Sequence, residues 1–459
     1  MVRALGDAFA DMCNADGKYA FYVRRIEHGR DTMADPNTLS AIDAAAAIRS
    51  GQLTSERLVE ACLARIEARE GMVGAWTYIN PDQALTEARA RDKQEPKGLL
   101  HGVPVGIKDV IDTADMPTEY GSPIYKNHQP ACDAACVAQV RESGGVILGK
   151  TVSTEFATRY AGKTRNPHNT DHTPGGSSSG SGASVADCMV PLAFGTQTTG
   201  SHIRPASYCG IVGYKPSFNM IDRAGLKQLS QSFDTLGVHG RTVKDTVLVV
   251  TALADFHVPE NAWEIAGTPK IAFCRTPVWD EADASTQALV EEAASRLGAQ
   301  GAEVVDVSLP AAFDQLADVH TTISEFEFCR ALTYERTHFL EMLSEHLRGR
   351  LEHGMGWTRA EYEAAWRKVA HCAGLMEDVF NDYDVILAPS VPGEAPRFEE
   401  GTGSPIFSQF WTPLGLPCVN VPVLEGPTGL PIGIQLLAPL GEDARALTHA
   451  DWVHRKLGS

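Results

Sequence analysis

The chain has 459 residues, and its 58 acidic against 40 basic side chains give a formal net charge of −18. This acidic balance argues against general binding to nucleic acid or to an anionic membrane. No apolar run approaches the roughly 18 residues that span a bilayer, and the N-terminus lacks the apolar core of a signal peptide. Ten scattered cysteines indicate free thiols in a reducing cytoplasm rather than a disulfide framework.

The elements expected along the chain alternate between helices and strands. Residues 1–36 show weak periodicity and read as an N-terminal extension, which leaves residues 37–459 as one domain. Helices are expected over 39–50, with Gly51 as the stop, and after Thr54. A helix and a strand are expected within 135–149, then a strand at 270–274, a helix at 285–297 and strands at 303–307 and 384–389. Residues 311–380 read as mostly helical. This alternation predicts an α/β layer fold.

One expected strand ends in a lysine. Residues 100–112 contain an apolar run in which Val103, Val105 and Ile107 share one face, so that Lys108 lies on the other face beside Gly106. A lone lysine at the end of a strand is usually solvated. Whether Lys108 has a functional role therefore depends on which other residues lie near it in the fold.

The most informative stretch runs from Pro174 to Pro205, where two glycine-rich loops centred on Ser177 and Ser201 flank an apolar segment. Alone, G-G-S-S-S-G-S-G would read as a flexible linker, but linkers do not usually alternate so closely with apolar segments. The match to a G-x-S-x-G nucleophile elbow, with Ser178 at its centre, is rejected because no hydrophobic strand precedes it. Glycine-rich backbone next to serine hydroxyls suits a nucleophile beside an oxyanion site.

These motifs together resemble the amidase signature family. The family has a G-G-S-S-[GS]-G loop and, about two dozen residues later, a G-T-D-x-G-G-S-I-R loop; here Ser177 and Ser201 are 24 residues apart. The family's upstream lysine motif corresponds to the G-V-P-V-G-I-K-D run that contains Lys108. The resemblance implies one α/β domain with a large mixed sheet covered by helices on both faces.

The resemblance also implies the chemistry. Ser201 is expected as the nucleophile, Ser177 as the bridging serine after a cis peptide bond from Gly176, and Lys108 as the base. Ser178 is expected to support the loop. The backbone N–H groups of the nucleophile loop are the expected oxyanion donors: Thr198, Thr199, Gly200 and Ser201. No metal or cofactor is implied, and the spacings of Cys132 and Cys136, and of His168 and His172, are weak metal signals.

The nucleophile loop departs from the usual family text. Gln197 stands where the family has aspartate, and Arg204 lies three residues past the serine rather than two. This variant resembles the malonamidase branch, in which that arginine holds a substrate carboxylate. Arg204 and Gln197 are therefore expected at the substrate, on a carboxylate-bearing amide such as malonamate, with a loop-supporting Arg204 as the alternative. His202 is read as packing rather than as a base.

Three functions remain open at this point. The first is a free-standing amidase that acts on a small-molecule amide. The second is the glutaminase subunit of a tRNA-dependent amidotransferase, and the third is a catalytically inactive homologue that acts as a binding protein. The substrate pocket is expected to come from loops within 120–170 and 310–410. The oligomeric state is open, a homodimer included.

Overall fold

The computed structural model describes residues 35–458. Most of the expected N-terminal extension therefore lies outside the described residues, and the boundary at residue 37 stays a prediction. A short 3-10 turn, Pro36–Thr38, begins the described chain.

One mixed sheet of eleven strands, counted over the described residues, runs through the molecule in the order β1-β3-β2-β4-β6-β5-β10-β11-β9-β7-β8. Its strands are β1 (Trp76–Ile79), β2 (Pro104–Lys108), β3 (Val146–Thr151), β4 (Leu192–Gln197), β5 (Val212–Lys215), β6 (Thr235–Gly240), β7 (Lys270–Cys274), β8 (Glu303–Val307), β9 (Val385–Pro389), β10 (Cys418–Glu425) and β11 (Pro431–Leu437). Strand β2 pairs in parallel with both β3 and β4. The central strands from β4 to β9 pair antiparallel. The prediction of a large mixed sheet is confirmed.

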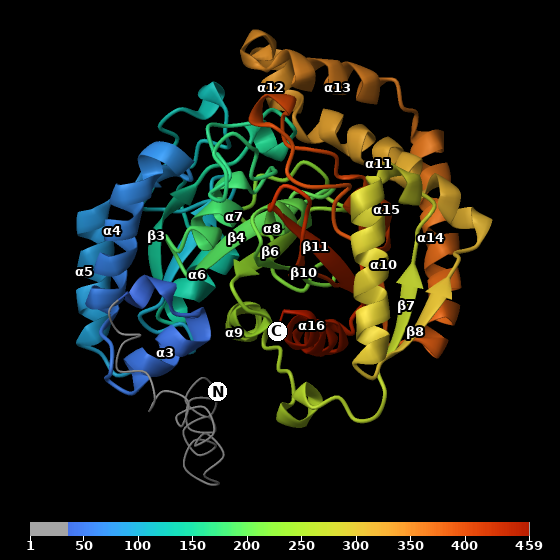
Figure 1. The fold of residues 1–459 in the computed structure, drawn as a ribbon. Helices are drawn as coiled ribbons and strands as arrows, with labels where there is room; N and C mark the ends of the chain where they lie inside the picture. Colours follow the sequence, from blue (N-terminus) through green and yellow to red (C-terminus); the bar gives the residue numbers. More distant parts are fainter. Residues whose placement is uncertain (1–34, 459) are drawn as a thin grey trace.

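Helices cover both faces of this sheet (Figure 1). They are α3 (Ala41–Arg49), α4 (Ser55–Val73), α5 (Pro81–Asp92), α6 (Ala135–Glu142), α7 (Ser179–Ala186), α8 (Ile203–Tyr208), α9 (Val243–Ala254), α10 (Ala284–Ala299), α11 (Leu316–Ala331), α12 (Thr333–His338), α13 (Glu345–Met355), α14 (Arg359–Asp382), α15 (Ile406–Trp411) and α16 (Asp443–Leu457). Among the described residues, no helix is long and apolar enough to cross a membrane.

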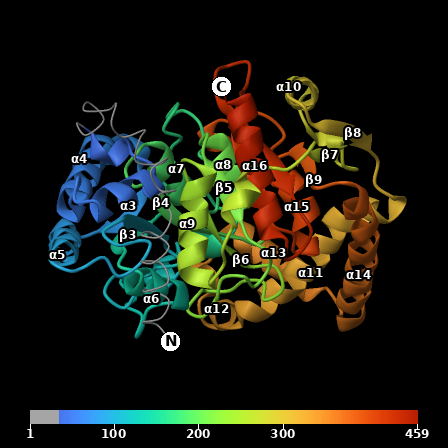
Figure 2. The same cartoon turned by 90° about the horizontal axis from the view of Figure 1, so that it is seen from below.

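The alternation of side chains along the strands divides the core between the two faces. In β4, Leu192 and Phe194 join the apolar cluster under α6, α9, α10 and α16, whereas Ala193 joins the cluster under α3, α4 and α5 on the opposite face. Helices α9 and α16 lie side by side on the first face (Figure 2). A third cluster, beneath α11 and α14, covers the second face at the β7–β9 end.

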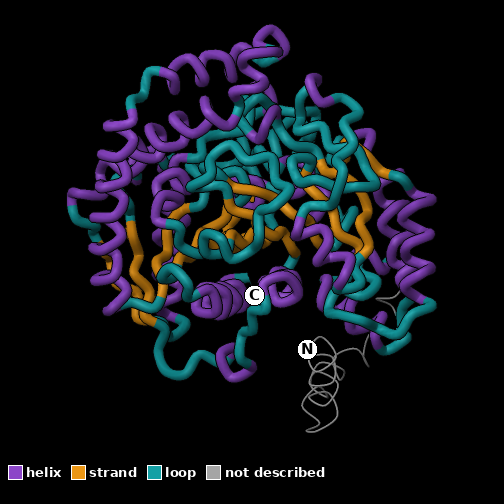
Figure 3. Tube along the Cα trace, turned by 180° about the vertical axis from the view of Figure 1, so that it is seen from behind, coloured by secondary structure: helices purple, strands orange, loops and turns teal. Residues whose placement is uncertain are grey.

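The stretch from Pro174 to Pro205 lies between the second and third of these apolar clusters, where loops cover the central strands (Figure 3). Helices α7 and α8 pack there against each other, α7 contacting β2 and β4 and α8 contacting β5, β10 and β11.

The expected helices at 39–50 and after Thr54 are confirmed as α3 and α4, with Ser40 and Thr54 accepting hydrogen bonds as N-caps.

The glycine-serine stretch is not all loop. Residues Ser179–Ala186 form α7, although glycine and serine are poor helix formers. The reason is close packing, because a Cβ on Gly180 would lie 2.1 Å from Ala75 O and 2.3 Å from Val152 N. Glycine is needed here for the approach of the helix to neighbouring backbone rather than for flexibility.

Candidate active site

Lys108 ends β2 with its side chain on the face that carries α7. Val105 and Ile107 point into the opposite core cluster, as the alternation predicted, and Gly106 leaves room on the Lys108 side. A Cβ at Gly106 would meet Thr151 and Trp76 at 3.1 and 3.3 Å. The Lys108 side chain is fully buried.

The Lys108 amine contacts three hydroxyl groups. Its Nζ lies 2.7 Å from Ser177 Oγ, 2.7 Å from Thr196 Oγ1 and 3.0 Å from Ser178 Oγ. Burial lowers the pKa of Lys108 well below its ordinary value, and the negative charge of Asp234 raises it only partly back. Burial therefore favours the neutral form of the amine.

A neutral amine fits these contacts with one lone pair to spare. Ser178 donates its proton to Thr196 O and accepts from Thr196 N, so it can only accept from Lys108. A neutral amine has two N–H groups and one lone pair, so it can donate to two of these hydroxyls and accept from Ser177 or Thr196. Its 2.7 Å contact with Ser177 places Lys108 within reach of the Ser177 proton.

The two serine loops meet through the backbone. The peptide bond between Gly176 and Ser177 is cis, as the resemblance implied, and Ser178 N donates to Ser201 O at 3.1 Å. Ser201 is 6% exposed, and within residues 35–458 its hydroxyl makes no hydrogen bond. The backbone of Ser201 is thus joined to the loop that carries Ser177, and no described protein group occupies the Ser201 hydroxyl.

The carbonyl groups of the loop before Ser201 are all engaged. Thr198 O contacts His320 Nε2 at 2.8 Å, and Thr199 O accepts from the Thr412 hydroxyl at 2.9 Å. Gly200 O accepts from the amide of α8 at residue 204, at 3.1 Å. In a trans peptide the N–H points away from the preceding carbonyl, so fixing these oxygens also fixes the N–H groups of residues 199–201.

Those N–H groups are available to a ligand. Among the described residues, no protein acceptor receives a hydrogen bond from the backbone N–H of Thr198, Thr199, Gly200 or Ser201. Unpaired donors converging beside a nucleophile are the geometry of an oxyanion hole. A substrate oxygen would satisfy donors that are otherwise unpaired.

Two side chains that hold this loop were not found from the sequence. Asp234 is buried and accepts from the Thr198 hydroxyl and from the amides of Leu229 and Ser230. Burial raises its pKa to about 6. His320, whose pKa burial lowers to about 4, stacks on Phe233. Neither residue lies in or next to one of the sequence motifs, so their contacts with the loop are visible only in the folded structure.

The structure does not place Arg204 and Gln197 at a substrate. Gln197 Oε1 accepts from the amides of His202 and Ile203, each at 3.1 Å. The guanidinium of Arg204 is 2% exposed and donates to Gly176 O at 2.5 Å, Gly403 O at 2.9 Å and Thr402 Oγ1 at 3.2 Å. Both side chains therefore contact the loop backbone, while Gln197 Nε2 donates to the Thr412 hydroxyl at 3.4 Å and Arg204 Nε has no hydrogen-bond partner within residues 35–458. These contacts fit the loop-supporting alternative for Arg204, and a substrate contact of either residue stays a prediction.

His202 packs behind the loop. Its ring stacks on His239 with centroids 3.8 Å apart, and its Nε2 lies 3.1 Å from Val238 O. Burial lowers its pKa well below the ordinary value, which keeps the ring neutral. The interpretation as packing rather than base agrees with these contacts.

The two weak metal signals have other partners. His168 Nε2 lies 2.9 Å from Cys209 O, and His172 Nδ1 lies 2.6 Å from Ala395 O. Cys136 is buried and Cys132 is exposed. Over residues 35–458 no group of three or more histidine, cysteine or acidic side chains could hold a metal ion.

Comparison with known proteins adds to this geometry. Residues 57–447 match the model of the Amidase family. The chain is 31% identical over 482 residues to a glutamyl-tRNA(Gln) amidotransferase subunit of Oleidesulfovibrio alaskensis, covering 93% of this chain and 99% of that protein. It is 32% identical over 472 residues to the corresponding protein of Acidothermus cellulolyticus, covering 90% and 93%.

Solved structures agree in fold. A crystal structure of an amidase superposes with a TM-score of 0.85 at 27% identity, over 92% of this chain and all of that one (100%). The native peptide amidase of Stenotrophomonas maltophilia gives a TM-score of 0.80 at 28% identity, over 92% and 97%.

Proposed function

Because the chain belongs to the Amidase family, we propose that it hydrolyses an amide through Ser201 as nucleophile, Ser177 as proton relay and Lys108 as base. The observation that carries the proposal is the buried Lys108 amine, 2.7 Å from Ser177 Oγ. A neutral lysine can accept a proton, whereas a solvated, charged lysine cannot. The inactive-homologue interpretation lacks support, since all three groups are present and arranged.

The proton path follows from the contacts. Lys108 accepts the Ser177 proton, Ser177 accepts the Ser201 proton, and Ser201 Oγ attacks the amide carbon. The oxyanion that forms is stabilised by the unpaired N–H groups of residues 198–201. The protons return through Ser177 to the leaving nitrogen, which departs as ammonia or an amine and leaves an acyl ester on Ser201. Water activated by the same relay then releases the carboxylate.

For the substrate class we propose a small primary amide that also carries a carboxylate, such as malonamate or glutamine. The malonamidase-like text of the nucleophile loop supports the first. The second is supported by the relatives, which are named as subunits of a glutamyl-tRNA(Gln) amidotransferase. If the chain works in such a complex, it would release ammonia from glutamine for a protein partner; this is the second candidate function.

Ammonia release by the purified chain alone tests both functions. The panel contains malonamate, glutamine and neutral aliphatic amides, with Ser201→Ala as the inactive variant. Ser184→Ala is the matched control, because this buried α7 serine bonds only to Ser181 O within its own helix.

Turnover without a partner that is lost in Ser201→Ala and kept in Ser184→Ala would support the free-standing amidase. Glutamine turnover that appears only after an amidotransferase partner is added would support the role in a complex. Equal turnover in Ser201→Ala and the unmodified chain would refute the mechanism.

A further inference from the structure

The peptide groups of the nucleophile loop are not held by regular secondary structure. Strand β4 ends at Gln197 and helix α8 begins at Ile203, so residues 198–202 belong to neither a strand nor a helix. The directions of their carbonyl and N–H groups therefore depend on contacts from other parts of the chain. An oxyanion hole acts only if its donors already point at the position where the charge develops, so these outside contacts matter for the chemistry.

Thr198 is held at both its side-chain and its carbonyl oxygen. Its hydroxyl donates to Asp234, and its carbonyl lies 2.8 Å from His320 Nε2. Because a carbonyl can only accept, the proton of the imidazole is on Nε2. The His320 ring stacks on the Phe233 ring, with centroids 4.9 Å apart, and Phe233 precedes Asp234 in the chain. The two supports of Thr198 therefore contact each other.

His320 is a buried donor with one polar contact. The residue is 2% exposed, and burial lowers its pKa to about 4, which keeps the ring neutral. With the proton on Nε2, its Nδ1 carries a lone pair, and this buried atom has no hydrogen-bond partner among the described residues. An unpaired buried acceptor costs stability. The contact with Thr198 is therefore what a histidine supplies here and an apolar side chain would not.

A second helix holds the next two peptide groups. The Thr412 hydroxyl, directly after α15, lies 2.9 Å from Thr199 O. The start of α15 packs against Gly200, where an added Cβ would be 2.9 Å from Pro405 Cβ and 3.0 Å from Ser408 Cβ. The nucleophile loop is thus contacted by α11 and by the segment that contains α15.

Gln409 joins these two helices beside His320. Its Nε2 donates to Ala317 O at 2.9 Å and to Thr321 Oγ1 at 3.0 Å. Ala317 lies about one turn before His320 on α11, and Thr321 is the next residue. The two N–H groups of one amide therefore tie the turn of α11 that carries His320 to α15.

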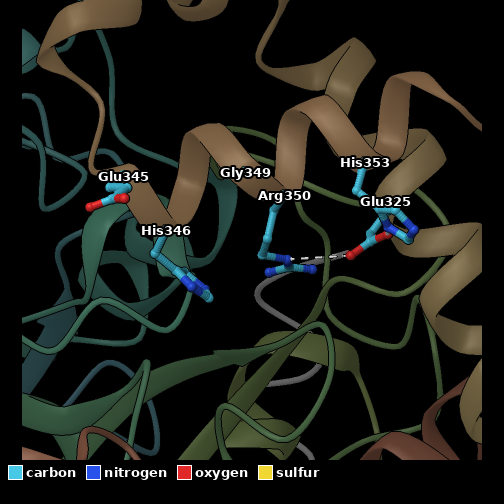
Figure 4. Close-up of a pocket in the computed structure, with 6 residues that line it drawn as sticks. All are labelled: Glu325, Glu345, His346, Gly349, Arg350 and His353. Carbon is cyan, nitrogen blue, oxygen red and sulfur yellow. Dashed lines mark hydrogen bonds and ion pairs between the residues drawn. The ribbon is translucent and has the colours of Figure 1, made fainter.

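The far part of α11 is fastened to α13. Glu325 lies five residues beyond His320, about 7.5 Å along the helix, and accepts from His353 at 2.6 Å. Arg350 lies 3.7 Å from the same carboxylate (Figure 4). These residues line a pocket of about 610 Å³ between α11 and α13. The contacts around this pocket hold the helix that presents His320 to the loop.

We propose that His320 is a positioning residue of the oxyanion hole and that Gln409 holds it in place. By bonding Thr198 O, the imidazole sets the plane of the peptide between Thr198 and Thr199. The N–H of Thr199 then points away from that carbonyl, toward the substrate oxygen. The inference rests on the proposed function. His320 acts as a hydrogen-bond donor that keeps its proton, and it touches no reacting atom.

Two substitutions of His320 test this role. His320→Leu removes the donor, and His320→Gln restores one, because the Nε2 of glutamine can reach the same carbonyl. We expect His320→Leu to lower kcat about 10- to 100-fold for an amide that the chain hydrolyses. The KM should stay within about two-fold, because an oxyanion hole binds the transition state and not the ground state. His320→Gln should return kcat to within about three-fold of the unmodified chain.

An aldehyde with the acyl group of that amide separates positioning from a loss of folded protein. Such an aldehyde adds reversibly to a nucleophilic serine and places its oxygen where the oxyanion forms. Its Ki should rise in His320→Leu by about the factor by which kcat falls. A smaller fraction of folded protein would instead lower kcat and leave Ki unchanged.

His101→Leu is the matched control for this comparison. His101 is also buried, its Nε2 contacts Arg91 O at 3.2 Å, and its Nδ1 likewise has no partner within residues 35–458. Its replacement removes the same kind of contact away from the nucleophile loop. We expect a lower Tm and an unchanged Ki for the aldehyde.

Gln409→Leu tests the tie between the two helices. We expect it to lower kcat about 3- to 10-fold. The double variant with His320→Leu should lose less than the product of the two single losses, because both substitutions act on one contact. A double loss equal to that product would overturn the part assigned to Gln409.

Hydrogen exchange of the peptide that covers residues 198–202 reads the loop without substrate. Exchange should be faster in His320→Leu than in the unmodified chain, and His320→Gln should restore the slower rate. An unchanged kcat in His320→Leu, or a lowered kcat with an unchanged Ki, would overturn the positioning role and leave the hydrolase intact. If no amide is hydrolysed although exchange rises in His320→Leu, the proposed function fails while the contact that orders the loop stands.

Discussion

The Lys108 amine lies 2.7 Å from the Ser177 hydroxyl, across 69 residues of chain, and both side chains are fully buried. Burial lowers the pKa of Lys108 and favours its neutral form. This contact is the basis for the proposed roles of Lys108 as base and Ser177 as relay. The amine also contacts the hydroxyls of Ser178 and Thr196.

Lys108→Met should abolish the base and yet stabilise the fold. We expect a loss of about 10²- to 10⁴-fold in kcat. The folded pKa lies below the unfolded value of about 10.4. Between the two values the unfolded chain binds a proton that the folded chain does not, and this opposes folding increasingly as the pH falls from about 10.4. Replacing the amine removes that opposition. The Tm of Lys108→Met should exceed that of the unmodified chain at pH 7, and the difference should shrink as the pH rises toward 10. A lower Tm at pH 7 would contradict a neutral Lys108.

Asp234→Asn should shift the pH dependence of the reaction. The carboxylate charge of Asp234 raises the pKa of Lys108, so its removal lowers that pKa further and moves the acid limb of kcat/KM to lower pH. The comparison belongs above pH 6, because burial raises the Asp234 pKa to about 6 and the carboxylate is charged only above it. Asp222→Asn is the control, since this exposed carboxylate contacts only the Ala224 amide. A fall in rate without a shifted limb would assign Asp234 a purely structural role.

Replacing Gly195 or Gly237 by alanine, which adds a methyl group behind the nucleophile loop, should lower both the stability of the fold and the activity. A Cβ on Gly195 would lie 2.5 Å from His202 Nδ1, and one on Gly237 would lie 2.7 Å from His202 Cδ2. We expect each alanine variant to lower the free energy of unfolding by about 1–3 kcal/mol, measured by urea denaturation. Gly374→Ala in α14, where no atom lies within 4 Å, should instead stabilise by about 0.5–1 kcal/mol. An undamaged Gly195→Ala would show that the loop can move away from His202.

Arg204→Met should impair every substrate alike. Its guanidinium holds Gly176 O and Gly403 O, so its removal disturbs the backbone at the bridging serine, whatever the substrate carries. We expect a fall in Tm, and kcat/KM for malonamate and malonamide should decrease by the same factor. A loss confined to malonamate would restore Arg204 as the carboxylate anchor.

The sequence was sufficient for the fold class and singled out Lys108 and Ser177, whose contact the structure shows, because each belongs to a motif with a fixed local sequence. The role of Ser201 stays a prediction. For Arg204 the sequence left two roles open, since the same residue at the same spacing can face a ligand or a backbone carbonyl, and the burial and backbone contacts of Arg204 favour the second. The glycine-serine run around Ser177 was expected as loop, but the structure begins helix α7 within it at Ser179, where Gly180 packs closely against neighbouring backbone.

Other residues that contact the nucleophile loop could not be predicted from the sequence. Asp234 and His320 carry no motif, and they contact Thr198 from segments that are far apart in the chain. The substrate pocket was expected from loops within 120–170 and 310–410, and this stays a prediction.

The most direct test of the mechanism is mass spectrometry of protein quenched during turnover of an amide that the chain hydrolyses. We predict an acyl adduct on the peptide that contains Ser201, absent in Ser201→Ala and strongly reduced in Lys108→Met. An adduct on Ser177 or Ser178, or turnover that persists in Ser201→Ala, would contradict the assignment of Ser201 as the nucleophile.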